Sequence, residues 1–201
     1  LIAEKKRGRK FTLANYPCNL EVLENATGII VHSNFSKKLV TKEHKDLNQC
    51  CQITSLPHKA KQYNKAEAKK MLGFNEDDFI ICSFGLIEPR KLHHKILGVF
   101  CNSKISTEKK CHLIFVGENH KGDYGKNISK IILDNQTRKS IKITEYVKQE
   151  EYEKYLSAAD MAIQLRESSR GESSASLIDC LGYGVPTIIN TNGSFEEIPN
   201  D

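Results

Sequence analysis

A serine-rich segment from residue 166 to residue 186 carries many of the side chains that could do chemistry. It contains the run Arg170-Gly171-Glu172-Ser173-Ser174 and ends in Gly184-Val185-Pro186. Gly171 permits a tight turn and a close approach of the backbone to a ligand. Ser173 and Ser174 can cap a helix that starts there, and the N–H groups and macrodipole of a helix N-terminus favour an anion. We therefore expect a phosphate to bind at this turn.

Two carboxylates in the same segment could bind the rest of such a ligand. Glu172 and Asp179 are seven residues apart, about two helical turns, so both are expected to face the same way on a helix. Carboxylates repel a diphosphate unless cations intervene, but they accept hydrogen bonds from hydroxyls, which favours Glu172 on a sugar and Asp179 on a ribose diol. The candidate cations are Arg166, Arg170 and Lys91. From this segment alone, a solvated loop with ordinary serine capping remains an alternative.

Seven apolar, β-rich runs alternate with helical patterns along the chain. This alternation predicts a parallel sheet with crossover helices. Ligands of open parallel sheets bind beyond the carboxyl ends of the strands, so chemistry is expected in the loops that follow such runs. The runs span residues 28–32, 52–56, 79–84, 112–116, 140–143, 161–165 and 186–190.

A polar stretch with no clear period, residues 57–63, begins with a proline and predicts a linker between two domains. We place the boundary there, with residues 1–57 on one side and residues 58–201 on the other. The last apolar run lies close to the final residue, which indicates a fragment of a longer protein.

Composition narrows the class of protein. With 201 residues, of which 39% are hydrophobic and 27% are charged, the chain suits one α/β core with an extension. It has no run of about 18 apolar residues, and its seven cysteines form no CxxC pair, so we expect a soluble, cytoplasmic protein without structural zinc. His93 and His94 point about 100° apart on a helix, so no metal site is expected there.

The net charge of +5 suits several anionic partners, namely a nucleoside diphosphate, an acidic membrane surface or nucleic acid. A solvated lysine-rich surface accounts for it as well. The chain has no basic strand interleaved with aromatic residues, which argues against nucleic acid. The basic run from Lys5 to Lys10 could contact an anionic membrane, so peripheral contact at the inner face of a membrane stays open.

Further motifs follow one another in the order of a known enzyme family. The first, Phe84-Gly85-Leu86-Ile87-Glu88-Pro89-Arg90-Lys91, is a glycine loop that ends in a lysine, and Phe115-Val116-Gly117-Glu118 follows as a strand and turn. Thr144-Glu145-Tyr146-Val147 and Gly193-Ser194-Phe195-Glu196-Glu197 come before and after the serine-rich segment. Together these motifs resemble family 4 of the glycosyltransferases, which are retaining enzymes built from two Rossmann-like domains (the GT-B fold).

This resemblance implies that residues 58–201 form a Rossmann-like parallel sheet with helices on both faces, the half that binds a nucleotide sugar. Residues 1–57, which include Tyr16-Pro17, would be the remnant of the acceptor-side domain with the linker. The donor implied is a UDP-sugar or a GDP-sugar, with no further cofactor and no metal. The acceptor implied is a glycan or a lipid-linked molecule, as in polysaccharide or cell-envelope glycan biosynthesis.

The resemblance also implies roles for individual residues. Gly85 and Lys91 would form the phosphate-binding loop, and Val147 would lie where the base meets backbone atoms. Lys91, the helix N-terminus near Ser173 and an arginine would stabilise the charge that develops on the leaving diphosphate. Glu172 would orient the sugar in a transfer that retains the anomeric configuration.

The chain departs from the family pattern in three ways. Leu86 stands where an arginine usually follows the loop glycine, and Arg90 or Arg170 is the candidate replacement because a guanidinium binds phosphate oxygens with two donors. The second acidic residue is Asp179, seven residues after Glu172, where the family usually has a second glutamate after eight. Most of the acceptor domain is absent, so a non-catalytic nucleotide-sugar-binding or regulatory module is the alternative function.

Overall fold

The computed structural model describes residues 20–43, 47, 49–56, 63–107, 110–136 and 138–199. The expectations for residues 5–10, for Tyr16-Pro17 and for residues 57–62 of the linker lie outside this part of the chain. No helix of the described part is both long enough and apolar enough to cross a membrane.

All seven apolar runs form strands, and the strands make two parallel sheets. They are β1 (Ile29–Val31), β2 (Cys51–Ile53), β3 (Phe79–Phe84), β4 (Cys111–Val116), β5 (Ile141–Ile143), β6 (Met161–Gln164) and β7 (Thr187–Ile189). β1 pairs with β2, and the other five strands form a sheet in the order β5-β4-β3-β6-β7. β1 and β2 precede the linker and pair with each other, and the five strands of residues 58–201 form one parallel sheet, as predicted for that part of the chain.

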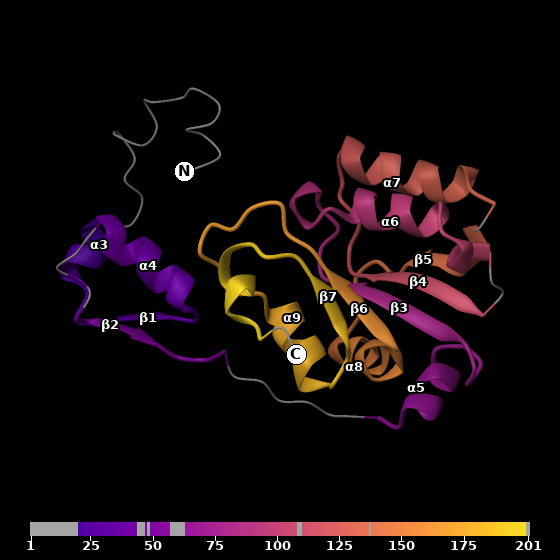
Figure 1. The fold of residues 1–201 in the computed structure, drawn as a ribbon, viewed down its shortest axis with the longest axis horizontal. Coiled ribbons are helices and arrows are strands. Elements are labelled where there is room, and N and C mark those ends of the chain that lie inside the picture. The colour runs from indigo at the N-terminus through magenta and orange to yellow at the C-terminus, as the bar shows by residue number, and fades with distance from the viewer. Residues whose placement is uncertain are drawn as a thin grey trace.

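Helices cover both faces of the five-stranded sheet (Figure 1). The α-helices are α3 (Leu20–Asn25), α4 (Asn34–Glu43), α5 (Lys65–Met71), α6 (His93–Cys101), α7 (Asp123–Asp134), α8 (Gln149–Ala158) and α9 (Ala175–Gly182). Short 3-10 helices are η2 (Pro89–Lys91), η3 (Lys104–Thr107), η4 (Arg138–Ser140) and η5 (Gly193–Glu197). α6 and α7 lie on one face, and α5, α8 and α9 lie on the other. This confirms the predicted Rossmann-like arrangement.

Local signals in the sequence fix several helix ends. The Asn64 side chain accepts hydrogen bonds from the N–H groups of Ala66 and Glu67 and caps α5. Gly73 follows the same helix with φ +82°, a conformation that glycine adopts without strain. The predicted cap of α9 is also present, because Ser174 Oγ accepts from Leu177 N at 3.3 Å.

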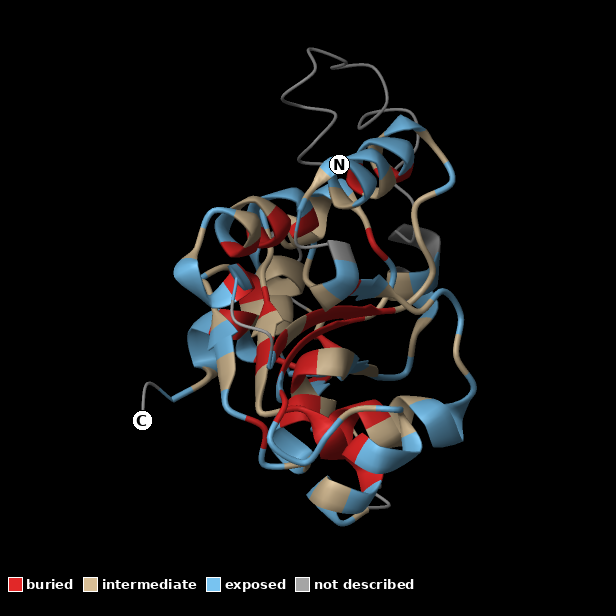
Figure 2. Cartoon of the chain, turned by 90° about the vertical axis from the view of Figure 1, so that its right-hand side faces the viewer, coloured by how far each residue is buried: buried red, intermediate tan, exposed pale blue. Residues whose placement is uncertain are grey.

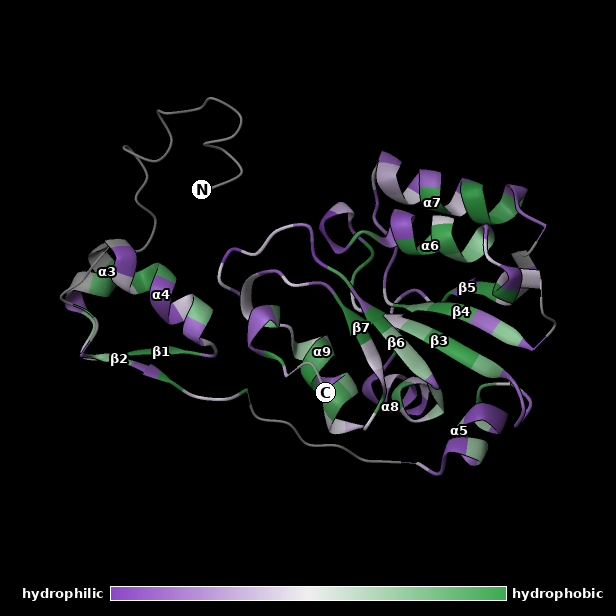
Figure 3. Cartoon of the chain, in the orientation of Figure 1, coloured by the Kyte–Doolittle hydropathy of each residue, from purple (hydrophilic) through white to green (hydrophobic). Residues whose placement is uncertain are grey.

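The core consists of two apolar clusters, one on each face of the sheet. Side chains alternate along a strand, so Ile80 and Cys82 of β3 face α5 and α8, whereas Ile81 faces α6. Figure 2 shows the buried residues on the strands and on the helix sides that face them. Figure 3 shows the same separation by hydropathy, with hydrophobic strands in the middle of this domain and hydrophilic residues on α5 and the outer helix turns.

The strand order reverses between β3 and β6. From β3 the chain moves outward through β4 to β5, and it then returns to β6 on the other side of β3 and continues to β7. The loops that leave the carboxyl ends of β3 and β6 therefore diverge toward opposite faces. In open parallel sheets a crevice forms at such a switch point, and ligands bind there.

An ion pair between Asp160 and Lys69, on the face of the sheet that α5 covers, connects α5, β3 and the start of β6. The Asp160 carboxylate, just before β6, accepts a hydrogen bond from Ile80 N at 2.9 Å and lies 2.9 Å from Lys69 Nζ of α5. The Lys69 side chain is only 6% exposed, so its charge has little water to replace this partner. Burial pushes the pKa of Asp160 upward, but the hydrogen bonds from Ile80, Lys69 and Lys65 outweigh it and hold the pKa below its ordinary value.

We expect Asp160→Asn to lower the free energy of unfolding at pH 7 by about 2 kcal/mol, because it leaves the Lys69 ammonium buried without a counter-charge. A lowered pKa in the folded state means that the stabilisation is present above the ordinary pKa of 3.8 and is lost as the pH falls through the folded-state value. Urea unfolding at pH 7 and at acid pH checks both points. Asp77→Asn, which changes an exposed carboxylate, is the control and should show no comparable loss. Equal stability of wild type and Asp160→Asn at pH 7 would contradict this account.

Candidate functional site

A small cavity of about 140 Å³ lies between the loop after β3 and the loop after β6. This is the point at which the strand order reverses, where a ligand site is expected. Three of its lining residues are cations and two are carboxylates, so the cavity keeps an excess of positive charge. The lining residues are Glu88, Arg90, Lys91, Arg166, Ser168 and Glu172.

The loop after β3 folds back so that Lys91 packs on Gly85. Gly85 has φ +96°, and a Cβ at this position would overlap the Lys91 ammonium. Lys91 ends η2, and its Nζ lies 3.5 Å from the carbonyl oxygen of Phe84. The backbone conformation therefore favours glycine here, and a larger residue would also displace the Lys91 ammonium from its present position.

The Lys91 ammonium lacks a carboxylate within ion-pair distance among the described residues. Burial lowers its pKa below the ordinary value, and the positive charges of Arg166 and Arg90 lower it further, against the opposing effect of Glu88. A bound anion would reverse this electrostatic penalty. Lys91 is thus poised to bind a negative group that the protein itself does not supply.

The Glu172 carboxylate is held at the opposite wall of the cavity. Its Oε1 lies 2.8 Å from Arg166 Nη1 and 3.7 Å from Arg90 Nη1, and its Oε2 accepts a hydrogen bond from Arg170 N at 2.7 Å. Burial raises the pKa of Glu172, but backbone hydrogen bonds and the two arginines outweigh that effect and lower it overall. Glu172 is therefore ionised at neutral pH.

Arg90 is shared between two carboxylates. Its Nη2 lies 3.2 Å from both carboxylate oxygens of Glu88, and its longer contact is to Glu172. Because the contact with Glu172 is the weaker one, Arg90 can exchange it for a phosphate oxygen without losing Glu88. Of the two candidates named from the sequence to replace an arginine at Leu86, Arg90 lines the cavity and Arg170 does not.

The loop that carries Arg166 and Glu172 is fixed by the segment after β7. Asn190 accepts a hydrogen bond from Arg166 N and donates one to Arg166 O, both at 2.8 Å. Ser194 Oγ donates to Glu172 O at 3.3 Å, and the Arg166 guanidinium lies 5.1 Å from the Phe195 ring centre. The side chains of the cavity are therefore positioned before any ligand arrives.

The predicted phosphate turn precedes α9 as expected, but the helical relation between its two acids does not hold. Gly171 has φ +106°, and Ser174 caps the helix, which begins only at Ala175. Glu172 therefore lies before the helix, so two-turn spacing cannot place it on one face with Asp179. Ser173 Oγ is buried and has no hydrogen-bond partner among the described residues, which leaves a donor beside the helix N-terminus.

Seven of the predicted site residues do not line the cavity. Gly85, Gly171, Ser173 and Ser174 belong to the two loops described above, and the other three are Asp179, Val147 and Arg170. Asp179 accepts a hydrogen bond from the Tyr152 hydroxyl at 2.9 Å, and burial together with this carboxylate raises the pKa of Tyr152. Val147 packs against the apolar core in the turn after β5. Arg170 contributes its N–H to Glu172, but its side chain is exposed and does not line the cavity.

Two cavity residues were not predicted as site residues. Glu88 holds Arg90, and Ser168 lies in the loop after β6. An acid beside a basic pair, as in Glu88-Pro89-Arg90-Lys91, is the signal that could have identified Glu88. Behind this loop, the buried His93 side chain is neutral, because burial lowers its pKa to about 4.

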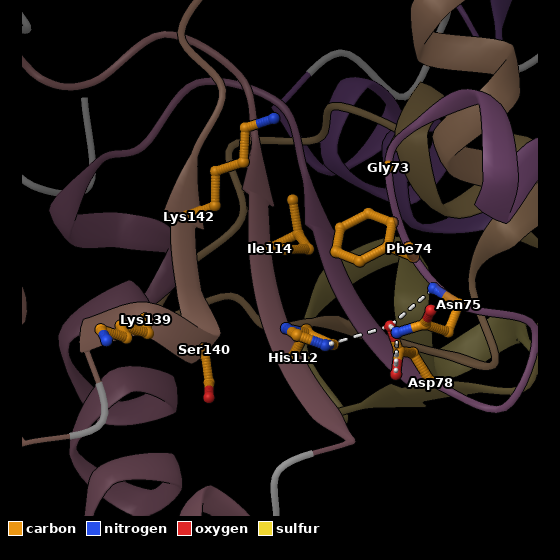
Figure 4. A pocket seen from close by; sticks show the side chains of 9 residues that line it. All are labelled: Gly73, Phe74, Asn75, Asp78, His112, Ile114, Lys139, Ser140 and Lys142. Atoms are coloured by element: carbon orange, nitrogen blue, oxygen red, sulfur yellow. Dashed lines mark hydrogen bonds and ion pairs between the residues drawn. The ribbon is translucent and has the colours of Figure 1, made fainter.

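A larger cavity of about 350 Å³ lies at the opposite edge of the sheet, at the amino ends of β3, β4 and β5 (Figure 4). There the His112 ring packs against Phe74, with a ring-centre distance of 5.1 Å, and its Nε2 lies 3.5 Å from Asp78 Oδ2. None of the predicted site residues lines this cavity. We therefore place the candidate site at the smaller cavity, where the cations converge.

Solved structures share this fold at low sequence identity. HepE from Anabaena in complex with UDP aligns with a TM-score of 0.73 and 14% identity, over 96% of this chain and 53% of that one. WaaG, a glycosyltransferase involved in lipopolysaccharide biosynthesis, aligns with a TM-score of 0.69 and 16% identity, over 98% and 56%. The catalytic domain of starch synthase IV from Arabidopsis thaliana, bound to ADP and acarbose, aligns with a TM-score of 0.67 and 13% identity. This alignment covers 89% of this chain and 42% of that one. The chain spans about half the length of these proteins.

A family model described as glycosyl transferases group 1 matches residues 64–201. No curated protein sequence matches the chain. The matched residues include every residue that lines the candidate site. The chain therefore belongs to the glycosyl transferases group 1 family and carries a Rossmann-like domain of the GT-B type.

Proposed function

We propose that the whole protein transfers a sugar from a nucleoside-diphosphate sugar to an acceptor, and that residues 58–201 bind the donor. The observation that carries this proposal is the convergence of Arg90, Lys91 and Arg166 at the point where the strand order reverses. Lys91 has no carboxylate partner among the described residues, and the three cations can each contact a different phosphate oxygen, which supports a diphosphate as the ligand. The UDP and ADP bound in the structural neighbours HepE and starch synthase IV support this choice of ligand.

In the proposed reaction the bond between the anomeric carbon and the diphosphate breaks, and negative charge grows on the leaving phosphate. Interactions that strengthen as this charge develops accelerate the reaction. Lys91 and Arg166 supply fixed positive charge, and Arg90 can turn from Glu172 to a phosphate oxygen. The N–H groups at the start of α9, with the hydroxyl of Ser173, supply further donors.

We assign the sugar to Glu172 and the nucleoside to the region of Asp179 and Val147. Glu172 accepts hydrogen bonds through its fixed carboxylate, and it can stabilise positive character at the sugar ring. Asp179 is a ribose acceptor in this proposal, with Tyr152 orienting its carboxylate. Glu145, in the left-handed region at φ +59°, accepts a hydrogen bond from Asn119 N and fixes the turn that precedes Val147. The resemblance to family 4 favours retention of the anomeric configuration.

The remaining parts of the proposal concern residues 1–57 and the partners of the whole protein. We propose that residues 1–57 are the end of an acceptor-side domain and that the acceptor is a glycan or a lipid-linked molecule. WaaG, a structural neighbour, acts in lipopolysaccharide biosynthesis, which supports this class of acceptor. We propose a cytoplasmic location, with peripheral contact at a membrane where a lipid-linked acceptor resides.

A second candidate function is a nucleotide-sugar-binding or regulatory module without turnover. Leu86 is 48% exposed at the place of the usual arginine, and the Glu172 carboxylate is engaged by Arg166. A protein that binds the donor but releases no nucleoside diphosphate in the presence of acceptor would have this function.

Lys91→Met is expected to weaken binding of UDP about tenfold or more, because it removes a cation that contacts phosphate. Titration calorimetry with UDP, GDP and ADP measures this and identifies the preferred base. Lys95→Met, which removes an exposed lysine of the next helix, is the matched control and should bind as wild type does. The ratio of the UDP affinities of wild type and Lys91→Met should shrink as the pH rises toward 10.5. The pKa of Lys91 is lowered, so this lysine loses its charge below pH 10.5, whereas the arginines stay charged. Equal affinities at neutral pH would contradict the assignment of Lys91.

Glu172→Gln is expected to lower the rate of sugar transfer by the whole protein about 100-fold or more, because it removes a fixed charge beside the reacting sugar. Affinity for UDP should stay the same or increase, since a negative charge near the diphosphate is lost. Release of UDP or GDP from a panel of UDP-sugars and GDP-sugars provides the assay, and NMR of the product gives its anomeric configuration. Glu167→Gln, an exposed neighbour in the same loop, is the control. Unchanged transfer by Glu172→Gln would refute the role of this carboxylate.

Asp179→Ala is expected to weaken binding of the preferred nucleoside diphosphate about tenfold and to leave binding of inorganic pyrophosphate unchanged, because Asp179 contacts the ribose in this proposal. The two titrations are compared on the same variant. A parallel loss for both ligands would instead point to a general distortion of the site.

A further inference from the structure

The carboxylate of Glu197, at the end of η5, caps the start of α4 across a large separation in the chain. Its Oε2 accepts hydrogen bonds from Asn34 N and Asn34 Nδ2, both at 2.9 Å, and its Oε1 accepts one from Phe35 N at 2.6 Å. The first N–H groups of a helix have no partner within the helix, and the positive end of its dipole favours a carboxylate. Backbone hydrogen bonds from Phe35 and Asn34 keep the pKa of Glu197 below its ordinary value, although burial opposes them. Glu197 therefore holds the first turn of α4 through a charged cap.

The same turn of α4 contacts the loop that carries Glu172. Ser33 Oγ accepts a hydrogen bond from Ser36 N at 3.0 Å, which completes the cap and orients Ser36. Ser36 Oγ in turn donates a hydrogen bond to the carbonyl oxygen of Gly171. Figure 1 shows the loops after β6 and β7 reaching toward α4. Glu197 thus holds Asn34 and Phe35 at the start of α4, and the next residue along the chain, Ser36, is hydrogen-bonded to the residue directly before Glu172.

Packing makes this contact specific. A Cβ at Gly171 would lie 3.1 Å from Leu39 Cδ1 of α4, and φ at Gly171 is +106°. A Cβ at Gly193 would lie 3.5 Å from the Phe35 ring and would overlap the side chain of Ser169. The two glycines therefore let α4 approach both the loop after β6 and the start of η5.

We propose that Glu197 is a positioning residue for donor binding, which acts by capping α4 so that Ser36 holds the carbonyl of Gly171 and fixes the loop of Glu172. This inference rests on the proposed function for its effect on nucleotide affinity, but the structural coupling is independent of it. Glu197 does not line the cavity, and the hydrogen bonds that its carboxylate makes within the described part of the chain go to Asn34 and Phe35. The route from Glu197 through α4 is separate from the contacts that Ser194 and Phe195 of η5 make with Glu172 and Arg166, and Ser36→Ala tests it alone.

The test measures hydrogen exchange and UDP binding in Glu197→Ala, with Glu196→Ala as the matched control. In Glu197→Ala we expect the amides of residues 34–36 and of residues 169–172 to exchange about fivefold to tenfold faster, as the loss of a helix cap implies. We also expect the affinity for UDP to fall about threefold to tenfold. Glu197→Gln keeps one acceptor oxygen and should give intermediate values. Glu196, an exposed neighbour on η5, should tolerate alanine without either change.

Ser36→Ala removes the hydrogen bond to the Gly171 carbonyl but leaves the Glu197 cap of α4 intact. It also provides the test if Glu197→Ala does not fold. It should speed exchange at residues 169–172 and weaken UDP binding while Glu197 still protects Asn34 and Phe35. The proposal is overturned if residues 169–172 keep their protection in Glu197→Ala and Ser36→Ala. It is also overturned if wild type binds UDP and both variants bind it equally well, because a merely structural cap would lower the melting temperature and leave the affinity of the folded protein unchanged. If wild type binds no nucleotide, the proposed function fails, and the exchange data alone decide whether Glu197 holds the loop.

Discussion

Arg166 and Glu172 are joined by a contact of 2.8 Å between Nη1 and Oε1, and the arrangement of the site depends on this ion pair. It brings a carboxylate among cations that would otherwise repel one another more strongly. Even so, the pKa of Lys91 stays below its ordinary value, chiefly because the ammonium is buried; Arg166 and Arg90 lower it further, and Glu88 opposes them. The folded protein thus keeps a concentration of positive charge that its own carboxylates balance only in part. A nucleoside diphosphate is the anion that we propose for this site.

The fold maintains this charge by fixing the two loops that carry it. One loop leaves β3 and returns Lys91 to the space beside Gly85, and the other leaves β6 and is held by Asn190 and Ser194. Both loops start from buried parallel strands, so their origins cannot move apart without disrupting the core. On its outer side the second loop meets α4, which Glu197 holds in place. Sheet topology supplies the crevice, and these hydrogen bonds supply the positions of the side chains.

The strands and the turns that border the candidate cavity could be predicted from the sequence because they rest on short-range patterns. Continuous apolar runs mark buried parallel strands, and Gly85 and Gly171 mark turns in the conformation that glycine favours. The position of Glu172 before α9 was not predicted, because spacing alone does not say where a helix begins. The contact of Glu197 with Asn34 joins residues 163 positions apart, and no local pattern reports such a pairing. Ser168 was missed for a similar reason, since nothing in a serine-rich loop distinguishes the serine that faces the cavity.

A crystal structure of the chain with bound UDP tests the central claim most directly. The account predicts that the diphosphate lies in the cavity between the loops after β3 and β6, within hydrogen-bonding distance of Lys91 and Arg166, with the nucleoside toward Asp179. Density for the nucleotide in the cavity at the amino ends of the strands, beside His112, would contradict it. So would a diphosphate that leaves Lys91 and Arg166 without contact.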